Sequence, residues 1–468
     1  LRRFLAFVGP GWMVSVGYMD PGNWATDMEA GARYQYSLLF VLLIANLMAI
    51  LLQSLTVRLG VITGLDLAQA SRVHFPRRLN LFLYFLCEFA IIACDLAEVI
   101  GAAVAMQLLF GLPLWAGCLL TLVDVIIILG LLSLAGRRMS RLGAAPGEES
   151  LLPTRILEGF VMFLVGGVAI CFIVLLGRVQ APTGPVLKGF LPTIEPLTSA
   201  NGLWISLGII GATVMPHNLY LHSHTVKARA FTHEYPVSWI SSTEGEPQLR
   251  RRQGGESIQW TIWLSLLDMI VALALAVFVN AAILIVSGAA FYGLDDAEAA
   301  GSADLFDAHS LLGKYLGQGA ATIFAIALLL SGLSATVTAT LAGQVVMEGF
   351  LGLGLKPWIR RFLSRGIAVI PATLIAAISG RQGLGDLLLW SQVILSLQLP
   401  FAVIPLVYLT SSSRIMKAGV PKSSSSTHPS SRPRQSWANP SWLTVLGWMV
   451  AAIIVCLNMV LLVQMAIG

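Results

Sequence analysis

Two short polar motifs interrupt long apolar stretches of this sequence. One reads Asp-Pro-Gly-Asn at 20–23, and the other reads Met-Pro-His-Asn at 215–218. Proline removes a backbone N–H donor and clashes with the preceding helical turn, so each motif should leave backbone carbonyls without helical partners. Unpaired backbone inside an apolar span is tolerated only where it faces protein, water or a ligand. Each motif is therefore a candidate binding position.

The residue types at these breaks suit a divalent cation. Asp20 and Asn23 carry side-chain oxygens, a freed carbonyl such as that of Ala212 adds another, and the thioether of Met215 is a soft donor. Sulfur disfavours calcium and magnesium relative to manganese, iron and softer ions. The alternatives are a helix-end turn for the first motif and core filling for Met215, because methionine often fills gaps in apolar cores. Because the motifs lie within apolar spans, we favour the metal-ligand interpretation.

Three acids occupy a third apolar span. Glu88, Asp95 and Glu98 are spaced by seven and three residues, which places them on one face of a helix. That face must look inward, because charged groups are costly in lipid. Arg365 opens a later span and could pair with one of these acids. The interpretation is a polar path leading away from the metal site, and the alternative is a static buried salt-bridge network.

Histidines and further acids also lie in apolar spans. His217 and His222 are five residues apart, so a two-histidine HExxH metal site is not expected. Imidazole titrates near neutral pH, which suits proton handling, although a structural role is an equal alternative for either histidine. Asp124 and Asp268 are intramembrane acids to which the sequence assigns no role.

The composition places these motifs in membrane-spanning helices. Of 468 residues, 56% are hydrophobic and 11% are charged, which is far more apolar than a soluble domain. Apolar runs of about 20 residues, the length that crosses a bilayer, recur along the chain. Eleven spans are predicted, near 5–30, 37–59, 80–109, 113–135, 156–177, 203–226, 258–288, 319–345, 364–380, 384–410 and 442–467. The five cysteines lie in these spans without CxxC spacing, so neither a disulfide framework nor a zinc site is expected.

The positive charges predict the orientation in the membrane. If the N-terminus is cytoplasmic, most of the 29 Lys and Arg fall in cytoplasmic segments, as the positive-inside rule requires. The five exceptions are Arg33, Arg178, Lys188, Lys314 and Arg381. An odd number of spans then places the C-terminus on the non-cytoplasmic side. The net charge of +5 reflects this topology and does not indicate nucleic-acid binding.

The expected fold is an all-α polytopic membrane protein. The Ser/Pro-rich stretch 411–441 is predicted to be a cytoplasmic linker. It separates a ten-helix transporter core at 1–410 from an eleventh transmembrane helix at 442–468. Pro and Asn recur at the same two places in the first and sixth spans, which is typical of inverted-repeat transporters. The two repeats would cover about 1–177 and 201–410.

These motifs, together with several further segments, resemble the Nramp family. The matching segments are Asp-Pro-Gly-Asn-Trp-Ala-Thr-Asp at 20–27, Asp-Leu-Ala-Glu at 95–98, Ala-Thr-Val-Met-Pro-His-Asn at 212–218, Gly-Gln-Val-Val-Met-Glu-Gly-Phe at 343–350, and Ser-Gln-Val through Gln-Leu-Pro at 391–400. Members of this family are proton-coupled divalent metal transporters with the leucine-transporter fold. The resemblance therefore implies a leucine-transporter-like 5+5 inverted repeat plus an eleventh helix.

The same resemblance implies roles for particular residues. Metal ligands are expected at Asp20, Asn23 and Met215, with the backbone carbonyl of Ala212 and a conformation-dependent contribution from Gln392. Proton movement would involve Asp20, His217, Glu88, Asp95, Glu98 and Arg365.

The expected function is proton-coupled import of divalent transition-metal ions, with Mn²⁺ or Fe²⁺ as cargo and no bound cofactor. The protein would be multi-pass, in a plasma or an endosomal or vacuolar membrane, with the lipid bilayer as its surroundings. A monomer should suffice, since one chain supplies both halves of the site. The alternatives are a related Mg²⁺ transporter and a non-transporting metal sensor on the same fold. An enzyme is not expected, because the sequence has no nucleophile–base pair and no HExxH motif.

Overall fold

The computed structural model describes residues 7–123, 151–232, 255–293, 305–352, 357–416 and 436–467, which form helices joined by loops. Within these residues, seven helical segments are long and apolar enough to cross a membrane. They are α4 (Leu39–Thr63), α6 (Arg77–Phe110), α8 (Leu151–Val179), α13 (Gly255–Ala290), α16 (Gln318–Leu351), α18 (Gly380–Gln398) with α19 (Pro400–Ser411), and α20 (Ser441–Ile467).

The other four expected spans are interrupted, shorter or only partly described. The first consists of α2 (Pro10–Ser15), the short 3₁₀ helix η1 (Val16–Tyr18) and α3 (Pro21–Tyr34). The sixth consists of α11 (Ala200–Thr213) and α12 (Pro216–Thr232). The ninth is α17 (Pro357–Ile378), and the fourth is described only over Leu114–Val123. Asp124 and the rest of that fourth span lie outside the described residues.

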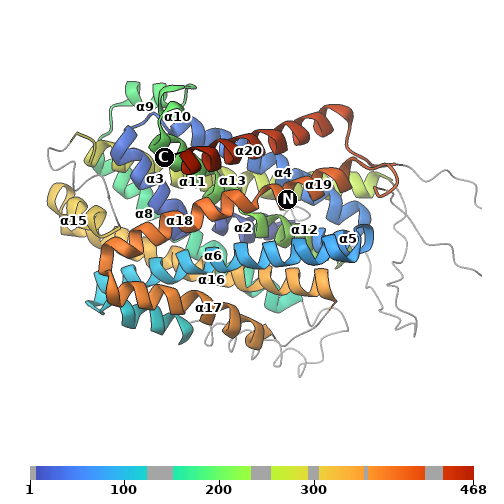
Figure 1. Ribbon diagram of the computed structural model, residues 1–468, viewed down its shortest axis with the longest axis horizontal. Helices are drawn as coiled ribbons and strands as arrows, with labels where there is room; N and C mark the ends of the chain where they lie inside the picture. Colours follow the sequence, from blue (N-terminus) through green and yellow to red (C-terminus); the bar gives the residue numbers. More distant parts are fainter. Residues whose placement is uncertain are drawn as a thin grey trace, which may run out of the picture.

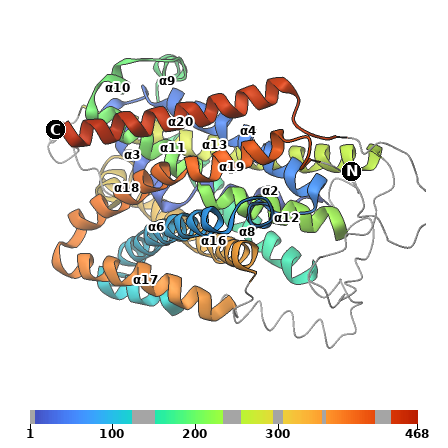
Figure 2. The same cartoon turned by 45° about the vertical axis from the view of Figure 1, so that its right-hand side comes forward.

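The long helices run roughly side by side along the long axis of the molecule (Figure 1). The short helices α9 (Thr183–Gly189), α10 (Glu195–Thr198) and α15 (Leu305–Leu316) lie toward one end of the bundle. Helix α5 (Leu67–His74) lies toward the other end. Helices α20 and α17 flank the bundle on opposite sides in both ribbon views (Figures 1 and 2). The broken first and sixth spans lie between these flanking helices.

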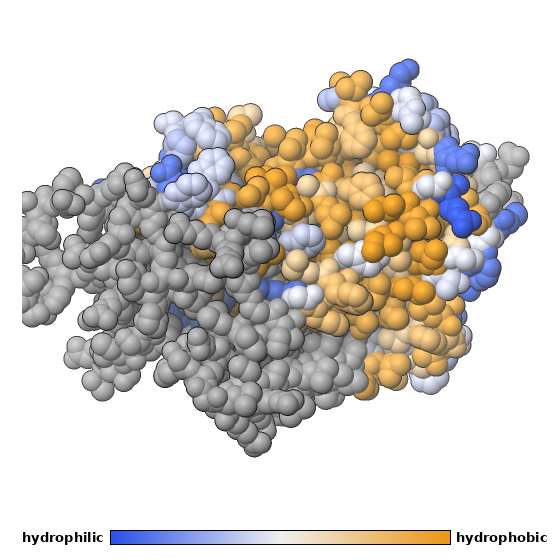
Figure 3. Space-filling model, turned by 180° about the vertical axis from the view of Figure 1, so that it is seen from behind, coloured by the Kyte–Doolittle hydropathy of each residue, from blue (hydrophilic) through white to orange (hydrophobic). Residues whose placement is uncertain are grey.

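The outer surface is apolar where a bilayer would surround it. Figure 3 shows a hydrophobic face that gives way to hydrophilic residues at its right-hand end. Exposed large side chains such as Phe85, Phe163, Ile370 and Ile378 belong to long helices. Exposed apolar surface on this scale marks contact with a partner or a membrane. Together with the seven apolar segments, this surface identifies an integral multi-pass membrane protein.

Glycines let neighbouring helices approach the two breaks closely. A Cβ on Gly101 of α6 would collide with Pro21, and a Cβ on Gly211 of α11 would collide with the backbone oxygen of Gln392 on α18. Because glycine has no side chain, α6 packs directly against the first break and α18 packs directly against the second. These contacts determine which side chains surround the breaks.

Asp268, which had no role in the sequence analysis, holds the start of α2. Its Oδ2 accepts a hydrogen bond from the N–H of Gly11 at 2.7 Å, and its Oδ1 accepts one from the N–H of Gly9 at 3.3 Å. Helix α2 has no side-chain cap of its own, so this carboxylate on α13 satisfies N–H groups that a helix start normally leaves unpaired. The half-helix before the first break is thereby attached to α13.

Candidate metal-binding site between the two broken helices

Proline at each break frees one particular carbonyl. In an α-helix the C=O of Gly17 would accept from residue 21 and that of Ala212 from residue 216, but both of these residues are proline. Asn23 supplies the missing donor to both carbonyls. Its Nδ2 lies 3.3 Å from Gly17 O and 3.1 Å from Ala212 O. One buried amide therefore joins the two breaks, which are 189 residues apart.

Asp20 begins α3 and has two carboxylate oxygens with different surroundings. Its Oδ1 accepts hydrogen bonds from both the backbone N–H and the side-chain Nδ2 of Asn23, each at 2.8 Å. Its Oδ2 lies 3.9 Å from the sulfur of Cys94 on α6. Asp20 and Asn23 are both fully buried. The first motif thus places one oriented carboxylate at the centre of the bundle.

Met215 reaches the same centre from the second break. It lies between α11 and α12, and its Sδ is 4.0 Å from the sulfur of Cys94. Gln392 of α18 approaches from the other side, where its side-chain amide lies against Gly22. Its Nε2 donates to Ser391 Oγ at 2.8 Å, and its Oε1 is buried without a hydrogen-bond partner. The five expected donor residues therefore gather around the two breaks.

Cys94 is the residue that the sequence analysis missed. It contacts Asp20 and Met215, and its sulfur also lies 3.8 Å from Glu98 Oε1. The available signal was its position directly before Asp95 and four residues before Glu98, on the inward face of the same helix.

The acids of α6 form a buried cluster with Arg365 of α17. Arg365 Nη1 lies 2.8 Å from Glu98 Oε2 and 4.0 Å from Asp95 Oδ1, and Nη2 donates to Thr336 Oγ1 at 3.2 Å. The arginine and both acids are fully buried. The expected pairing of Arg365 with these acids is therefore present. Glu88 lies two helical turns before Asp95 on the same helix and is half-buried, and its part in the polar path stays a prediction.

His222 belongs to a second polar network. Its Nδ1 is 2.8 Å from Gln53 Oε1 and 3.0 Å from Thr56 Oγ1 on α4. Gln53 in turn donates to the hydroxyl of Tyr18, at the edge of the first break. His217 follows Pro216 directly and is buried. The structure thus separates His222 from the cluster of acids and Arg365.

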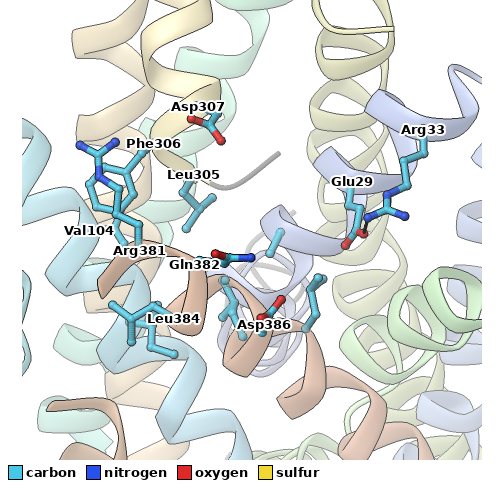
Figure 4. A pocket seen from close by; sticks show the side chains of 15 residues that line it. Glu29, Arg33, Val104, Leu305, Phe306, Asp307, Arg381, Gln382, Leu384 and Asp386 are labelled. Carbon is cyan, nitrogen blue, oxygen red and sulfur yellow. Dashed lines mark ion pairs between the residues drawn. The ribbon is translucent and has the colours of Figure 1, made fainter. Parts of the chain in front are cut away.

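A cavity of about 370 Å³ lies beside the site, toward the end of the bundle that carries α15. It is lined by residues of α3, α6 and α18, the helices that also carry Asp20, Cys94 and Gln392. Glu29 pairs with Arg33 at 2.9 Å, and Asp386, Asp307 and Arg381 line the remaining wall (Figure 4). Asp20 itself is fully buried and does not line the cavity. The site is therefore closed from this side.

A helical membrane bundle in which two interrupted helices meet at a buried polar centre is the architecture of a secondary transporter. A family model described as natural resistance-associated macrophage protein-like matches residues 11–145 and 149–426. The chain belongs to this family, Nramp, as the motifs indicated.

Relatives match along the full chain. A protein of Xanthomonas campestris named divalent metal cation transporter MntH is 47% identical, over 100% of this chain and 92% of its own length. The protein of that name from Bradyrhizobium diazoefficiens is 46% identical, over 100% of this chain and 91% of its own.

Solved structures agree with the fold. The crystal structure of a mutant of the Eremococcus coleocola manganese transporter has a TM-score of 0.79 and 33% identity, covering 98% of this chain and 86% of that chain. Mhp1, a nucleobase-cation-symport-1 family transporter, has a TM-score of 0.52 at 12% identity, covering 86% of this chain and 77% of that one, which supports the fold alone. The leucine-transporter-like fold is thereby confirmed. The division into two repeats of five helices plus an eleventh stays a prediction.

Proposed function

We propose that this protein carries divalent transition-metal ions, with Mn²⁺ or Fe²⁺ as cargo, into the cytoplasm together with protons. The single observation that carries this proposal is the buried donor set at the breaks. Asp20, Asn23, the Ala212 carbonyl and Met215 combine hard oxygens with a thioether in a site where unpaired polar groups are costly. Gln392, with an unpartnered oxygen against Gly22, would join them as the helices move.

The relatives support the class of cargo. Two of them are named divalent metal cation transporters, and a similar solved structure is that of a manganese transporter. Sulfur at the site argues against the magnesium alternative, because Mg²⁺ prefers an octahedron of oxygens. No feature of the described residues favours the sensor alternative.

A series of buried polar groups beside Asp20 supports the proposed proton coupling. The cluster of Asp95, Glu98 and Arg365 begins 3.8 Å from Cys94, which contacts the carboxylate of Asp20. A proton released from Asp20 could pass to these acids, while the His222 network offers a second route. A proton moving inward with the membrane potential gains roughly 2.3 kcal/mol per 100 mV. That energy is enough to bias accumulation of the metal more than about tenfold.

The proposed orientation has a cytoplasmic N-terminus and a non-cytoplasmic C-terminus. Two of the five basic residues assigned to the outside are Arg33 and Arg381, and both line the same cavity. They therefore lie on one side of the molecule, as this orientation requires. The cavity would then be the outer approach to the site. One chain supplies both breaks, so a monomer suffices, in a plasma or an endosomal or vacuolar membrane.

The test is metal uptake into proteoliposomes that hold a pH-sensitive dye. Wild-type protein should take up Mn²⁺ against a background of Ca²⁺ or Mg²⁺ and acidify the lumen. Asp20→Ala should abolish uptake, because it removes the carboxylate, and Met215→Ala should reduce the preference for Mn²⁺ over Ca²⁺ and Mg²⁺. Absence of Mn²⁺ flux in correctly folded wild type would overturn the proposal.

A further inference from the structure

Cys94 places a second sulfur at the proposed metal site. Its Sγ lies 3.9 Å from Asp20 Oδ2 and 4.0 Å from Met215 Sδ, so it lies between the carboxylate of one break and the thioether of the other. Cys94 is almost fully buried, and with Met215 it belongs to a small packed cluster that includes Ala90, Ala93 and Leu395. Cys94 thus contacts both of the side chains that are proposed to hold the ion.

The distances suit ligands that share one ion. Metal–sulfur bonds of about 2.3 Å and metal–oxygen bonds of about 2.0–2.2 Å separate neighbouring ligand atoms by roughly 3–4 Å. The separations from Cys94 to Asp20 and to Met215 are at the upper end of this range. Each separation is therefore compatible with Cys94 sharing an ion with that neighbour.

We propose that Cys94 is a specificity-determining ligand that shifts this transporter's preference toward thiophilic divalent ions. Two sulfurs beside one carboxylate make a softer donor set than a thioether alone, and soft donors favour soft ions such as Cd²⁺ more than they favour Mn²⁺. As the metal–sulfur bond forms, the Cys94 thiol releases its proton to water, because the thiolate is the form that coordinates metals. It rests on the proposed function, because it assumes that Asp20 and Met215 bind the cargo.

The alternative role for Cys94 is a weak hydrogen bond that only supports the site. The thiol contacts Glu98 Oε1 at 3.8 Å as well as Asp20, so it could connect the two acids without touching the ion. Serine keeps a donor at this position but replaces the sulfur with oxygen. Cys94→Ser therefore separates the two roles, because a hydrogen-bonding role survives the change and a sulfur ligand does not.

The experiment measures ion binding to the purified full chain in detergent. Cd²⁺ and Mn²⁺ affinities are determined by titration calorimetry, and X-ray absorption at the cadmium edge counts the sulfur neighbours of bound Cd²⁺. The variants are Cys94→Ser, Met215→Ala and the control Cys87→Ser. Cys87 is also buried on α6, two turns earlier, where it lines a small cavity with Leu83, Pro216 and Tyr220.

Two sulfur neighbours are expected in wild type and in the control, and one in each of the other variants. Cd²⁺ affinity should fall roughly tenfold in Cys94→Ser, while Mn²⁺ affinity changes less than about twofold. An unchanged sulfur count or an unchanged Cd²⁺-to-Mn²⁺ ratio in Cys94→Ser overturns the inference while leaving the proposed function intact. If Cys94→Ser does not fold, the wild type alone decides: a single sulfur neighbour of bound Cd²⁺ would contradict the inference that Cys94 is a ligand. Wild type that binds neither ion contradicts both proposals.

Discussion

Asn23 contacts the backbone of both broken helices. Its Nδ2 shares two N–H groups among three acceptors, namely the carbonyls of Gly17 and Ala212, which the prolines leave without helical partners, and Asp20 Oδ1. Buried carbonyls without a donor are costly, so a side chain that pairs both of them stabilises the two breaks together. An ion arriving at the site would compete with Asn23 for the Ala212 carbonyl, which links binding to rearrangement.

Asp66 lies outside the membrane spans, directly before α5. It caps α5 and receives bonds from Lys227 Nζ at 2.9 Å and from His224 Nδ1 at 3.1 Å. Burial alone would raise the pKa of Asp66, but the hydrogen bond and charge of His224 and Lys227 outweigh it and lower the pKa to about 2. The ionised carboxylate thus ties the loop before α5 to the end of α12.

This lowered pKa predicts how stability depends on pH. A depressed carboxyl pKa contributes stability that is complete above the unfolded value of 3.8 and is lost as the pH falls toward 2. Asp66→Asn should therefore destabilise the protein by about 2 kcal/mol at pH 7. The difference from wild type should shrink between pH 4 and pH 3 in thermal unfolding. A difference of equal size at both pH values would contradict this account.

At the scale of elements, each break depends on one proline. Pro216→Ala would restore an N–H that can pair with the Ala212 carbonyl, because residue 216 is four positions beyond it in the chain. We expect α11 and α12 to become more continuous and Mn²⁺ affinity to fall by roughly tenfold or more. Binding is measured by calorimetry and folding by thermal unfolding.

Pro371→Ala is the matched control, because this proline lies inside α17, away from the site. It should leave Mn²⁺ affinity within about twofold of wild type. Equal losses of affinity in both variants would mean that the break at Pro216 has no special role in binding.

Much of the element pattern could be predicted from the sequence. The positions of Pro21 and Pro216 located both breaks, and the three-residue spacing of Asp95 and Glu98 placed them correctly on one inward face with Arg365. The short helices α5, α9, α10 and α15 were not predicted, because they are too short and too polar to give a span signal. The seven-residue spacing predicts that Glu88 shares this face, and its place in the proton path stays a prediction.

Other features depend on tertiary contacts that no local pattern reveals. Asp268 caps a helix that lies 257 residues away in the sequence, and Cys94 reaches Met215 across 121 residues. A single acid or cysteine in an apolar run looks the same whether it packs against neighbours or completes a site. A residue that only packs is distinguished from one that completes a site by the tertiary packing of α6 and α13 against the first span.

At the scale of the whole molecule, the bundle keeps its polar groups at the centre and near its ends. The cavity beside α15 ends one helical turn from the site, since it is lined by Leu388 and Gln392 follows four residues later on the same helix. Asp20 does not line this cavity, so the proposed alternating access would require the broken helices to move relative to α6 and α18. The central claim is that one ion lies between the two breaks.

The most direct test is the anomalous diffraction of crystals of the wild-type protein soaked in Mn²⁺. A single peak is expected within roughly 2–3 Å of Asp20 and Met215, and it should disappear in Asp20→Ala crystals. A peak found only in the cavity beside Glu29 and Asp386 would contradict the account. So would the absence of any peak between the breaks at Mn²⁺ concentrations that support transport.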